Sequence, residues 1–247
     1  MPKIKTNASE NKYFAYLIEI RKRLLFVVSL FIAASVLGFI YYQKIIGITL
    51  NFFSLEGVNI VFTNPFQFFT LALNSGLIVG VAITFPILIY QLLNFLKPAL
   101  EPKEYRRILA LLPLALLLFI GGFIYGVAMM KYVLQIFYQA ATSLSIGNML
   151  DVENFLSKVL LTGLLMGVGF LFPIVMTLLM QLGLVKHSFF VHQRPIIYII
   201  FVIFVIFLPP PDLFSDVVLA APLVILFELT LILNRVFLKP VSPKGVR

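Results

Sequence analysis

The stretch "YLIEIRKRLLFVVSLFIAASVLGFIYYQ", residues 16–43, places a cluster of charges directly before a long apolar run. The apolar part, residues 24–43, has the length that a helix needs to cross the hydrocarbon core of a membrane, about 20 residues. In the charged part, the carboxylate of Glu19 lies among Arg21, Lys22 and Arg23. The stretch therefore predicts a membrane-spanning helix that is preceded by a cationic segment at the membrane surface.

The rest of the chain has the same apolar character. Of its 247 residues, 61% are hydrophobic and only 12% are charged, whereas a soluble domain is about half apolar and a quarter charged. The alternating pattern of barrel strands is absent, so we expect an all-α, polytopic membrane protein whose helices satisfy their own backbone hydrogen bonds. The sequence has no cysteine, which excludes disulfides, thiolate catalysis and cysteine–metal sites.

The apolar runs predict six transmembrane helices in a single integral membrane domain, residues 1–247. Proline falls inside four of these helices and is expected to bend them, because it removes a helix hydrogen bond. The predicted spans are 24–43, 66–96, 108–130, 155–182, 195–209 and 214–235, and the prolines are Pro86, Pro113, Pro173 and Pro222.

The fifth span is short. Its apolar part, "PIIYIIFVIFVIFL" at 195–208, would extend roughly 21 Å, less than the ~30 Å of a hydrocarbon core. Together with the sixth span it predicts two short C-terminal helices. Such helices either thin the bilayer locally or are shielded by the longer helices.

The lysine and arginine residues predict the orientation. With six spans, 16 of the 19 fall on the side of the two termini, and only Lys44, Lys131 and Lys158 fall on the other side. By the positive-inside rule both termini are cytoplasmic, in a cell inner or cytoplasmic membrane. The first helix is expected to be permanent because no signal-peptide cleavage site follows it. Residues 44–65 and 131–154 are then the longest non-cytoplasmic loops, the second with a short surface helix.

Glycine pairs at a spacing of four residues occur in three predicted spans. Small residues let membrane helices approach closely, so the pairs predict packing inside the bundle or, alternatively, an interface between subunits. The three pairs are Gly76/Gly80, Gly122/Gly126 and Gly163/Gly167.

Carboxylates on or near the predicted spans are the candidates for chemistry, because charge is costly in a membrane. Glu228 lies within the sixth span, where we expect it to bond the neighbouring "LNR" that ends at Arg235. Glu19 can pair with Arg23 four residues later, and such an exposed pair needs no function. A second acidic island, "KPALEPKEYRR" at 97–107, contains Glu101 and Glu104.

Three segments resemble motifs of the TatC family, a subunit of the twin-arginine protein translocase. "YLIEIRKRLL" at 16–25 is similar to H-L-x-E-L-R-x-R-L, and the next segment is similar to P-x-x-x-Y-Q-x-W-x-F-x-x-P-x-L-x-x-x-E-R. The last is similar to L-T-P-P-D-x-x-S-Q-x-x-L-A-x-P-x-x-x-L-Y-E. In this chain the second and third segments read "FPILIYQLLNFLKPALEPKEYRR", 85–107, and "LPPPDLFSDVVLAAPLVILFE", 208–228.

The resemblance implies a concave bundle, which the two short C-terminal helices fit. It implies a receptor that binds the twin-arginine signal peptides of folded precursors on the cytoplasmic side. It also implies partner subunits with one span, TatA and, where present, TatB, in an oligomeric complex driven by the proton-motive force. Glu19 and Glu104 match the family's signal-binding carboxylates, and Arg21 matches the arginine beside the first. Two carboxylates suit two guanidinium groups, because each pair forms charge-assisted, forked hydrogen bonds. No cofactor, metal, nucleic acid or enzymatic activity is expected.

Other motif positions are candidates for structural or partner-interface roles. At Leu171 the chain departs from the family, which has a polar residue there that faces partner helices. The candidates are Pro86, Gln91, Pro98, Leu171, Pro173, Pro210, Asp212 and Glu228.

Two other classes of function are alternatives. A secondary transporter of small molecules or ions would be expected to carry several intramembrane charges and inverted repeats. This sequence offers Glu228 as its one intramembrane candidate and has no sustained internal repeat. An intramembrane aspartyl protease would need two aspartates on facing helices, but Asp212 and Asp216 lie on one segment. The ATP-binding motif G-x-x-x-x-G-K-[ST] is absent as well.

Overall fold

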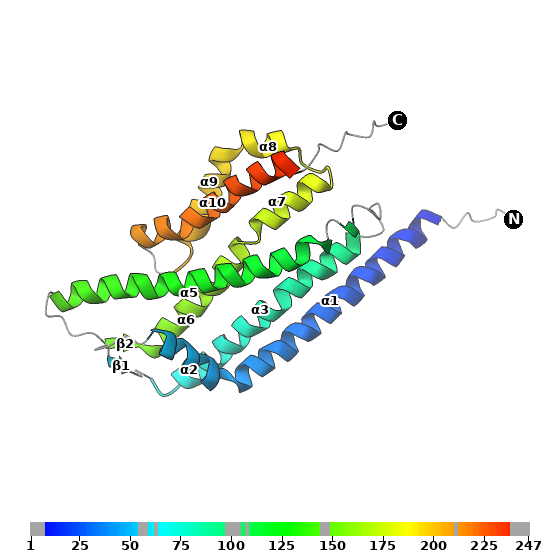
Figure 1. Cartoon of the computed structure of the whole chain (residues 1–247). Helices are drawn as coiled ribbons and strands as arrows, with labels where there is room; N and C mark the ends of the chain where they lie inside the picture. The colour runs from blue at the N-terminus through cyan, green and yellow to red at the C-terminus, as the bar shows by residue number, and fades with distance from the viewer. Residues whose placement is uncertain are drawn as a thin grey trace.

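The computed structural model describes residues 8–53, 59–61, 64–96, 105–106, 109–143, 149–209 and 212–237. This part of the chain is helical apart from two strands of three residues each (Figure 1). The strands are β1 (Asn59–Val61) and β2 (Met149–Asp151), and they pair in parallel with Ile60 beside Leu150. The helices are α1 (Ala8–Ile40), α2 (Tyr42–Phe53), α3 (Gln67–Leu96), α5 (Leu111–Ser143), α6 (Val152–Gly169), α7 (Phe172–Gln181), α8 (His187–His192), α9 (Arg194–Ile206) and α10 (Leu213–Phe237).

Five helical segments within the described residues are long and apolar enough to cross a membrane. The fifth predicted span forms α9, which has 13 residues and extends only about 20 Å. The prediction of a short sixth helix is wrong, since α10 has 25 residues and the segment Leu213–Val236 is long enough to cross a membrane. Many large apolar side chains on the outside of α1, α5, α9 and α10 are exposed, as expected of helices that face lipid. The five segments are Ile18–Ile40, Gln67–Gln91, Leu111–Phe137, Val152–Gln181 and Leu213–Val236.

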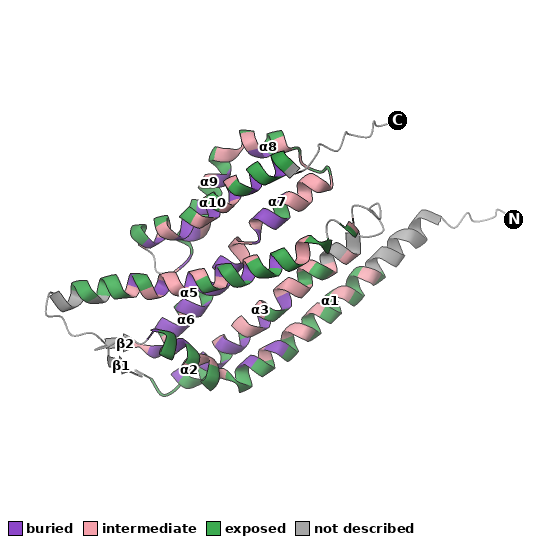
Figure 2. Ribbon diagram, in the orientation of Figure 1, coloured by how far each residue is buried: buried purple, intermediate pink, exposed green. Residues whose placement is uncertain are grey.

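Helices α6 and α7 occupy the middle of the molecule (Figure 2). In the most apolar 18-residue stretch of α6 and α7, 67% of the residues are buried inside the structure. The corresponding share for α1 is 11%. Helix α1 lies along α3, α5 packs on α6, and α7, α9 and α10 enclose a core around Met176, Phe201 and Phe227. The bundle is therefore organised around α6, and α1 is attached at its edge through α3.

The glycine pairs lie where helices approach one another most closely. A Cβ atom on Gly126 of α5 would lie 2.9 Å from the Cα atom of Gly163 on α6, and one on Gly76 of α3 would lie 2.7 Å from the carbonyl oxygen of Ser35 on α1. Such approaches leave no room for a side chain. The prediction that these glycines pack inside the bundle is confirmed for both helix pairs.

Three details differ from the sequence-based expectation. Residues 155–182 do not form one helix, because the ring of Pro173 cannot follow an uninterrupted turn and a new helix begins at Phe172. The predicted loop 44–65 begins with α2, whose Thr49 and Phe53 are buried one turn apart. Helix α5 continues to Ser143, and the predicted surface helix of the second loop is wrong, since residues 149–151 form β2.

The starts of α3 and α6 are joined at the end of the molecule that holds the strands. Asp151 accepts a hydrogen bond from the backbone N–H of Asn154 at 2.9 Å and so caps α6. Its other carboxylate oxygen accepts one from the side-chain amide of buried Gln67 at 2.6 Å. This contact ties the start of α3 to the start of α6.

Candidate functional site at the end of α3

Glu19 and Arg23 form the ion pair that their spacing predicts. Helix α1 is continuous through this region, so residues four apart lie on the same face. The guanidinium of Arg23 donates to Oε1 of Glu19 from Nε at 3.1 Å and from Nη2 at 2.6 Å. The side chain of Glu19 is 40% exposed and that of Arg23 is 23% exposed. The carboxylate is therefore accessible while its partner is largely covered.

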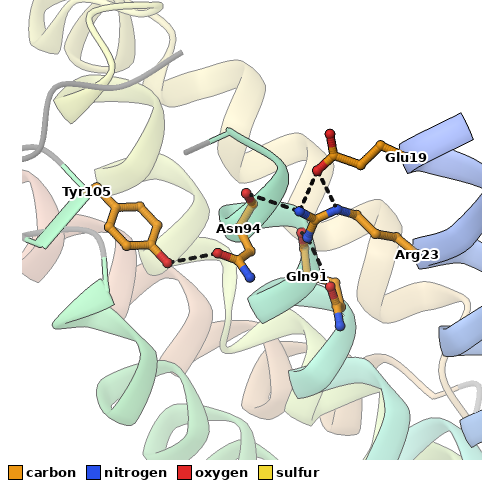
Figure 3. Close-up of polar contacts among 5 residues, drawn as sticks. All are labelled: Glu19, Arg23, Gln91, Asn94 and Tyr105. Atoms are coloured by element: carbon orange, nitrogen blue, oxygen red, sulfur yellow. Dashed lines mark hydrogen bonds and ion pairs between the residues drawn. The ribbon is translucent and has the colours of Figure 1, made fainter. Parts of the chain in front are cut away.

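Arg23 also reaches across to the last turns of α3 (Figure 3). Its Nη1 donates to the backbone carbonyl oxygen of Gln91 at 3.1 Å and to Oε1 of the same residue at 3.0 Å. Its Nη2 also lies 3.4 Å from the carbonyl oxygen of Asn94. Of these two carbonyl groups, that of Asn94 lies in the last turn of α3, where carbonyl groups lack partners within the helix. A cation there also interacts favourably with the negative end of the helix dipole. Arg23 thus holds Glu19 and the end of α3 together.

Asn94 extends the network to the segment that follows α3. Its side-chain oxygen accepts a hydrogen bond from the hydroxyl group of Tyr105 at 2.9 Å. Tyr105 comes directly after Glu104 in the sequence. Glu101 and Glu104, like Pro98, lie outside the described residues. The structure therefore places the neighbour of Glu104 beside the network that contains Glu19.

The remaining predicted site residues lie outside the hydrogen-bond network of Glu19 and Arg23. Arg21 is exposed on α1 and makes no hydrogen bond or ion pair with other described residues. Pro86 and Leu171 line one apolar cavity of about 860 Å³ between α3 and α5. Leu171, which precedes α7, is 3% exposed. Leu171 is thus part of a wall that is almost entirely apolar.

A family model described as Sec-independent protein translocase protein (TatC) matches residues 15–222. The chain belongs to the TatC family. It is 26% identical to the TatC protein of Carboxydothermus hydrogenoformans, over 95% of this chain and 96% of the relative. It is also 26% identical to TatCy of Bacillus subtilis (strain 168), over 95% of this chain and 92% of the relative.

The fold agrees with that of solved TatC structures. A crystal structure of the twin arginine translocase receptor TatC in DDM superposes with a TM-score of 0.78 at 26% identity, over 88% of this chain and 98% of the other. The family consists of membrane-embedded components of a protein translocase rather than enzymes. Twin-arginine protein transport is therefore the class of function to which this TatC family member belongs.

Sequence reasoning missed three residues of the site: Arg23 as a link to α3, Asn94 and Tyr105. The pairing of Arg23 with Glu19 is visible in the sequence, because it is local. The contacts of Arg23 with Gln91 and Asn94 join residues 68 and 71 positions apart. The motif at 85–107 contains Gln91 and so pointed to this residue, but a motif does not show which distant side chain contacts it.

A second polar cluster joins α9 to α10. Glu228 accepts a hydrogen bond from Nη2 of Arg194 at 2.9 Å and another from the hydroxyl group of Tyr198 at 2.5 Å. The expectation that Glu228 bonds the neighbouring "LNR" and Arg235 is wrong. Arg235 is exposed two turns further along α10, and Asn234 donates instead to Thr177 and to the carbonyl oxygen of Thr230. The reason is that the start of α9 packs against the second half of α10 and offers a guanidinium there.

We expect Arg194 and Glu228 to be coupled in stability. Arg194→Ala and Glu228→Ala should each destabilise the protein, and the double variant should be less destabilised than the two effects added, by about 1 kcal/mol. The pair is partly exposed, at 42% and 31%, so the larger coupling of a fully buried pair is not expected. Unfolding of the variants in detergent measures the coupling. Arg235→Ala with Glu228→Ala is the matched control, and equal coupling in that pair would contradict the assignment.

The motif aspartates lie at the start of α10. Asp212 accepts hydrogen bonds from the backbone N–H of Ser215 at 2.8 Å and from its hydroxyl group at 2.6 Å. It therefore caps the helix. Asp216 follows one turn later on the same helix, so the two aspartates do not face each other from separate helices. Pro210 lies outside the described residues, and Pro173 is buried in the first turn of α7.

Proposed function

We propose that this chain is the receptor subunit of a twin-arginine translocase and that it binds signal peptides through Glu19. The observation that carries the proposal is the state of the Glu19 carboxylate. One oxygen, Oε1, is held by Arg23, and no donor among the described residues contacts the other oxygen, Oε2. Figure 3 shows Oε2 directed away from the guanidinium. A TatC protein of the same fold is described as the twin arginine translocase receptor.

The chemistry of this carboxylate suits an arginine ligand. A guanidinium donates through a planar fork, so its bond to a carboxylate depends on direction, and it is more weakly hydrated than an ammonium group. We propose that Glu104 supplies the second carboxylate and that Arg21 flanks the first. The hydrogen bond between Tyr105 and Asn94 supports a shared site, because it ties the residue next to Glu104 to the network of Glu19.

We propose that the chain, residues 1–247, forms one domain that crosses the cell inner or cytoplasmic membrane six times. Both termini then lie in the cytoplasm. Helix α9, the fifth predicted span, supports the count of six. It is only 13 residues long, but it runs antiparallel to α10 in Figure 1. The distribution of lysine and arginine supports the orientation. In this arrangement Glu19 and the end of α3 face the cytoplasm, where precursors carrying a signal peptide arrive.

We further propose that the chain assembles with single-span TatA-type subunits, and with TatB where it is present, for transport driven by the proton-motive force. The motif positions Pro86 and Leu171 line an apolar cavity that opens between α3 and α5. An apolar wall binds a partner helix by shape and dispersion rather than by hydrogen bonds. Asp212 and Glu228 serve the fold in this proposal, because each is engaged by a neighbouring residue.

Export of a folded reporter tests the proposal. Cells that lack their own TatC receive this chain together with the TatA-type partner of its host. We expect export of a fluorescent protein that folds before transport when its signal peptide carries Arg-Arg, and loss of export when the pair is Lys-Lys. Export that ignores this change would overturn the receptor assignment. Uptake of a small molecule or ion by proteoliposomes of the chain alone would instead favour a secondary transporter.

A further inference from the structure

Arg23 donates hydrogen bonds to more acceptors than its ion pair with Glu19 requires. Its guanidinium donates to four different oxygen atoms, on Glu19, Gln91 and Asn94, and these atoms belong to two helices. Lys22, next to it on α1, is exposed and makes no hydrogen bond or ion pair with other described residues. The end of α3 therefore holds the side chain of Arg23 in place, whereas no described residue holds the side chain of Lys22.

The contact with Glu19 uses only one carboxylate oxygen. Both Nε and Nη2 of Arg23 donate to Oε1, so the guanidinium fixes the carboxylate without closing it. A glutamate side chain loses much rotamer freedom when it is fixed. Because α3 holds Arg23, the side chain of Glu19 loses this rotamer freedom before any ligand binds. Its Oε2, which no donor among the described residues contacts, is then an acceptor with a defined direction.

We propose that Arg23 is a positioning residue that makes Glu19 selective for a guanidinium over an ammonium ligand. The inference rests on the proposed function, in which Glu19 receives an arginine of the signal peptide. A planar fork gains from a carboxylate of fixed direction, whereas an ammonium group donates in three directions and gains little. Arg23 therefore raises the affinity for arginine more than the affinity for lysine.

An opposite role is conceivable from the same geometry. Arg23 could compete with the ligand for Glu19, in which case its removal would strengthen binding. Its loss also removes a positive charge close to the site, which favours any cationic ligand equally. These effects act on the affinity for both ligands, so the ratio of the two affinities separates positioning from competition and from charge.

The experiment measures binding of two fluorescent signal peptides, one with Arg-Arg and one with Lys-Lys, to the full chain in lipid nanodiscs. The measured quantity is the ratio of their dissociation constants. We expect Arg23→Gln to reduce the preference for Arg-Arg about five- to tenfold, which is part of the roughly 12- to 30-fold that the full rotamer freedom of one glutamate side chain would give. Gln91→Ala removes one of the four acceptors of Arg23 and should reduce the preference less. Lys22→Gln removes the same charge as Arg23→Gln and should leave the ratio unchanged.

Three results would overturn the inference. These are tighter Arg-Arg binding by Arg23→Gln, equal weakening of both peptides, and an equal change of the ratio in Lys22→Gln. Arg23→Lys keeps the charge but cannot span the four acceptors, so it should also lose the preference, and it replaces Arg23→Gln if that variant does not fold. A wild-type chain that binds neither peptide or does not discriminate would refute the proposed function itself. Discrimination that survives in Arg23→Gln and Arg23→Lys would refute only the role of Arg23.

Discussion

Replacing Glu19 with glutamine weakens the binding of a twin-arginine signal peptide by about 10- to 100-fold, the expected cost of one lost hydrogen-bonded charge. Glutamine keeps the size of the side chain and one oxygen that can accept from Arg23. The link between α1 and α3 is therefore retained, and the loss reports the missing negative charge rather than a disturbed fold. Site-specific cross-linking from the arginine pair of a precursor in inside-out vesicles gives an independent measure, and the adduct should disappear with the affinity.

Glu153→Gln is the matched control for this substitution. Glu153 is a carboxylate in the first turn of α6, at the end of the bundle opposite the Glu19 site (Figure 1). It should leave binding and cross-linking unchanged. If Glu19→Gln bound the peptide as tightly as the wild type, the pair of Glu19 and Arg23 would be a structural contact only. The membership of the TatC family would stand, but the binding site would have to lie elsewhere.

Gly122→Val is expected to destabilise the protein severely, while Gly121→Val on the same helix is tolerated. A Cβ atom on Gly122 would lie 2.6 Å from the carbonyl oxygen of Met166 and 2.7 Å from the ring of Phe170, whereas a Cβ atom on Gly121 meets nothing within 4 Å. Backbone atoms of α6 cannot move aside as a flexible side chain could. Overpacking of this kind costs about 3 kcal/mol, which is a large part of the stability of a typical domain.

Thermal unfolding in detergent compares the two variants. Both introduce the same β-branched residue into α5, so the small loss of helix propensity cancels in the comparison. We expect a lower melting temperature and a smaller monodisperse fraction for Gly122→Val alone. Equal melting temperatures would contradict the close approach of α5 and α6 at Gly122. A loss limited to oligomer formation would instead assign Gly122 to an interface between subunits.

The features that could be predicted from the sequence are those that depend on composition or on neighbours along the chain. Apolar runs of sufficient length identified the helical, membrane-embedded class, and α3 begins and ends close to the predicted limits of 66–96. The pair of Glu19 and Arg23 follows from helical spacing alone. The break before Pro173 was within reach of the sequence as well, since proline excludes an uninterrupted turn, although a bend was expected there.

The tertiary structure alone decided which distant groups meet. Arg23 bonds Gln91 across 68 positions, Arg194 bonds Glu228 across 34, and β1 pairs with β2 although about 90 residues separate them. No local pattern encodes such contacts, because they depend on how tilted helices pack against one another and on which small residues allow close approach. The sequence by itself determined the membrane class, the helices and a carboxylate beside an arginine. Only the packing of α1 on α3 decided that this arginine is held by α3 and that no donor among the described residues contacts the second carboxylate oxygen. The carbonyl group of Asn94 in the last turn of α3 becomes an available acceptor only once the helix has formed.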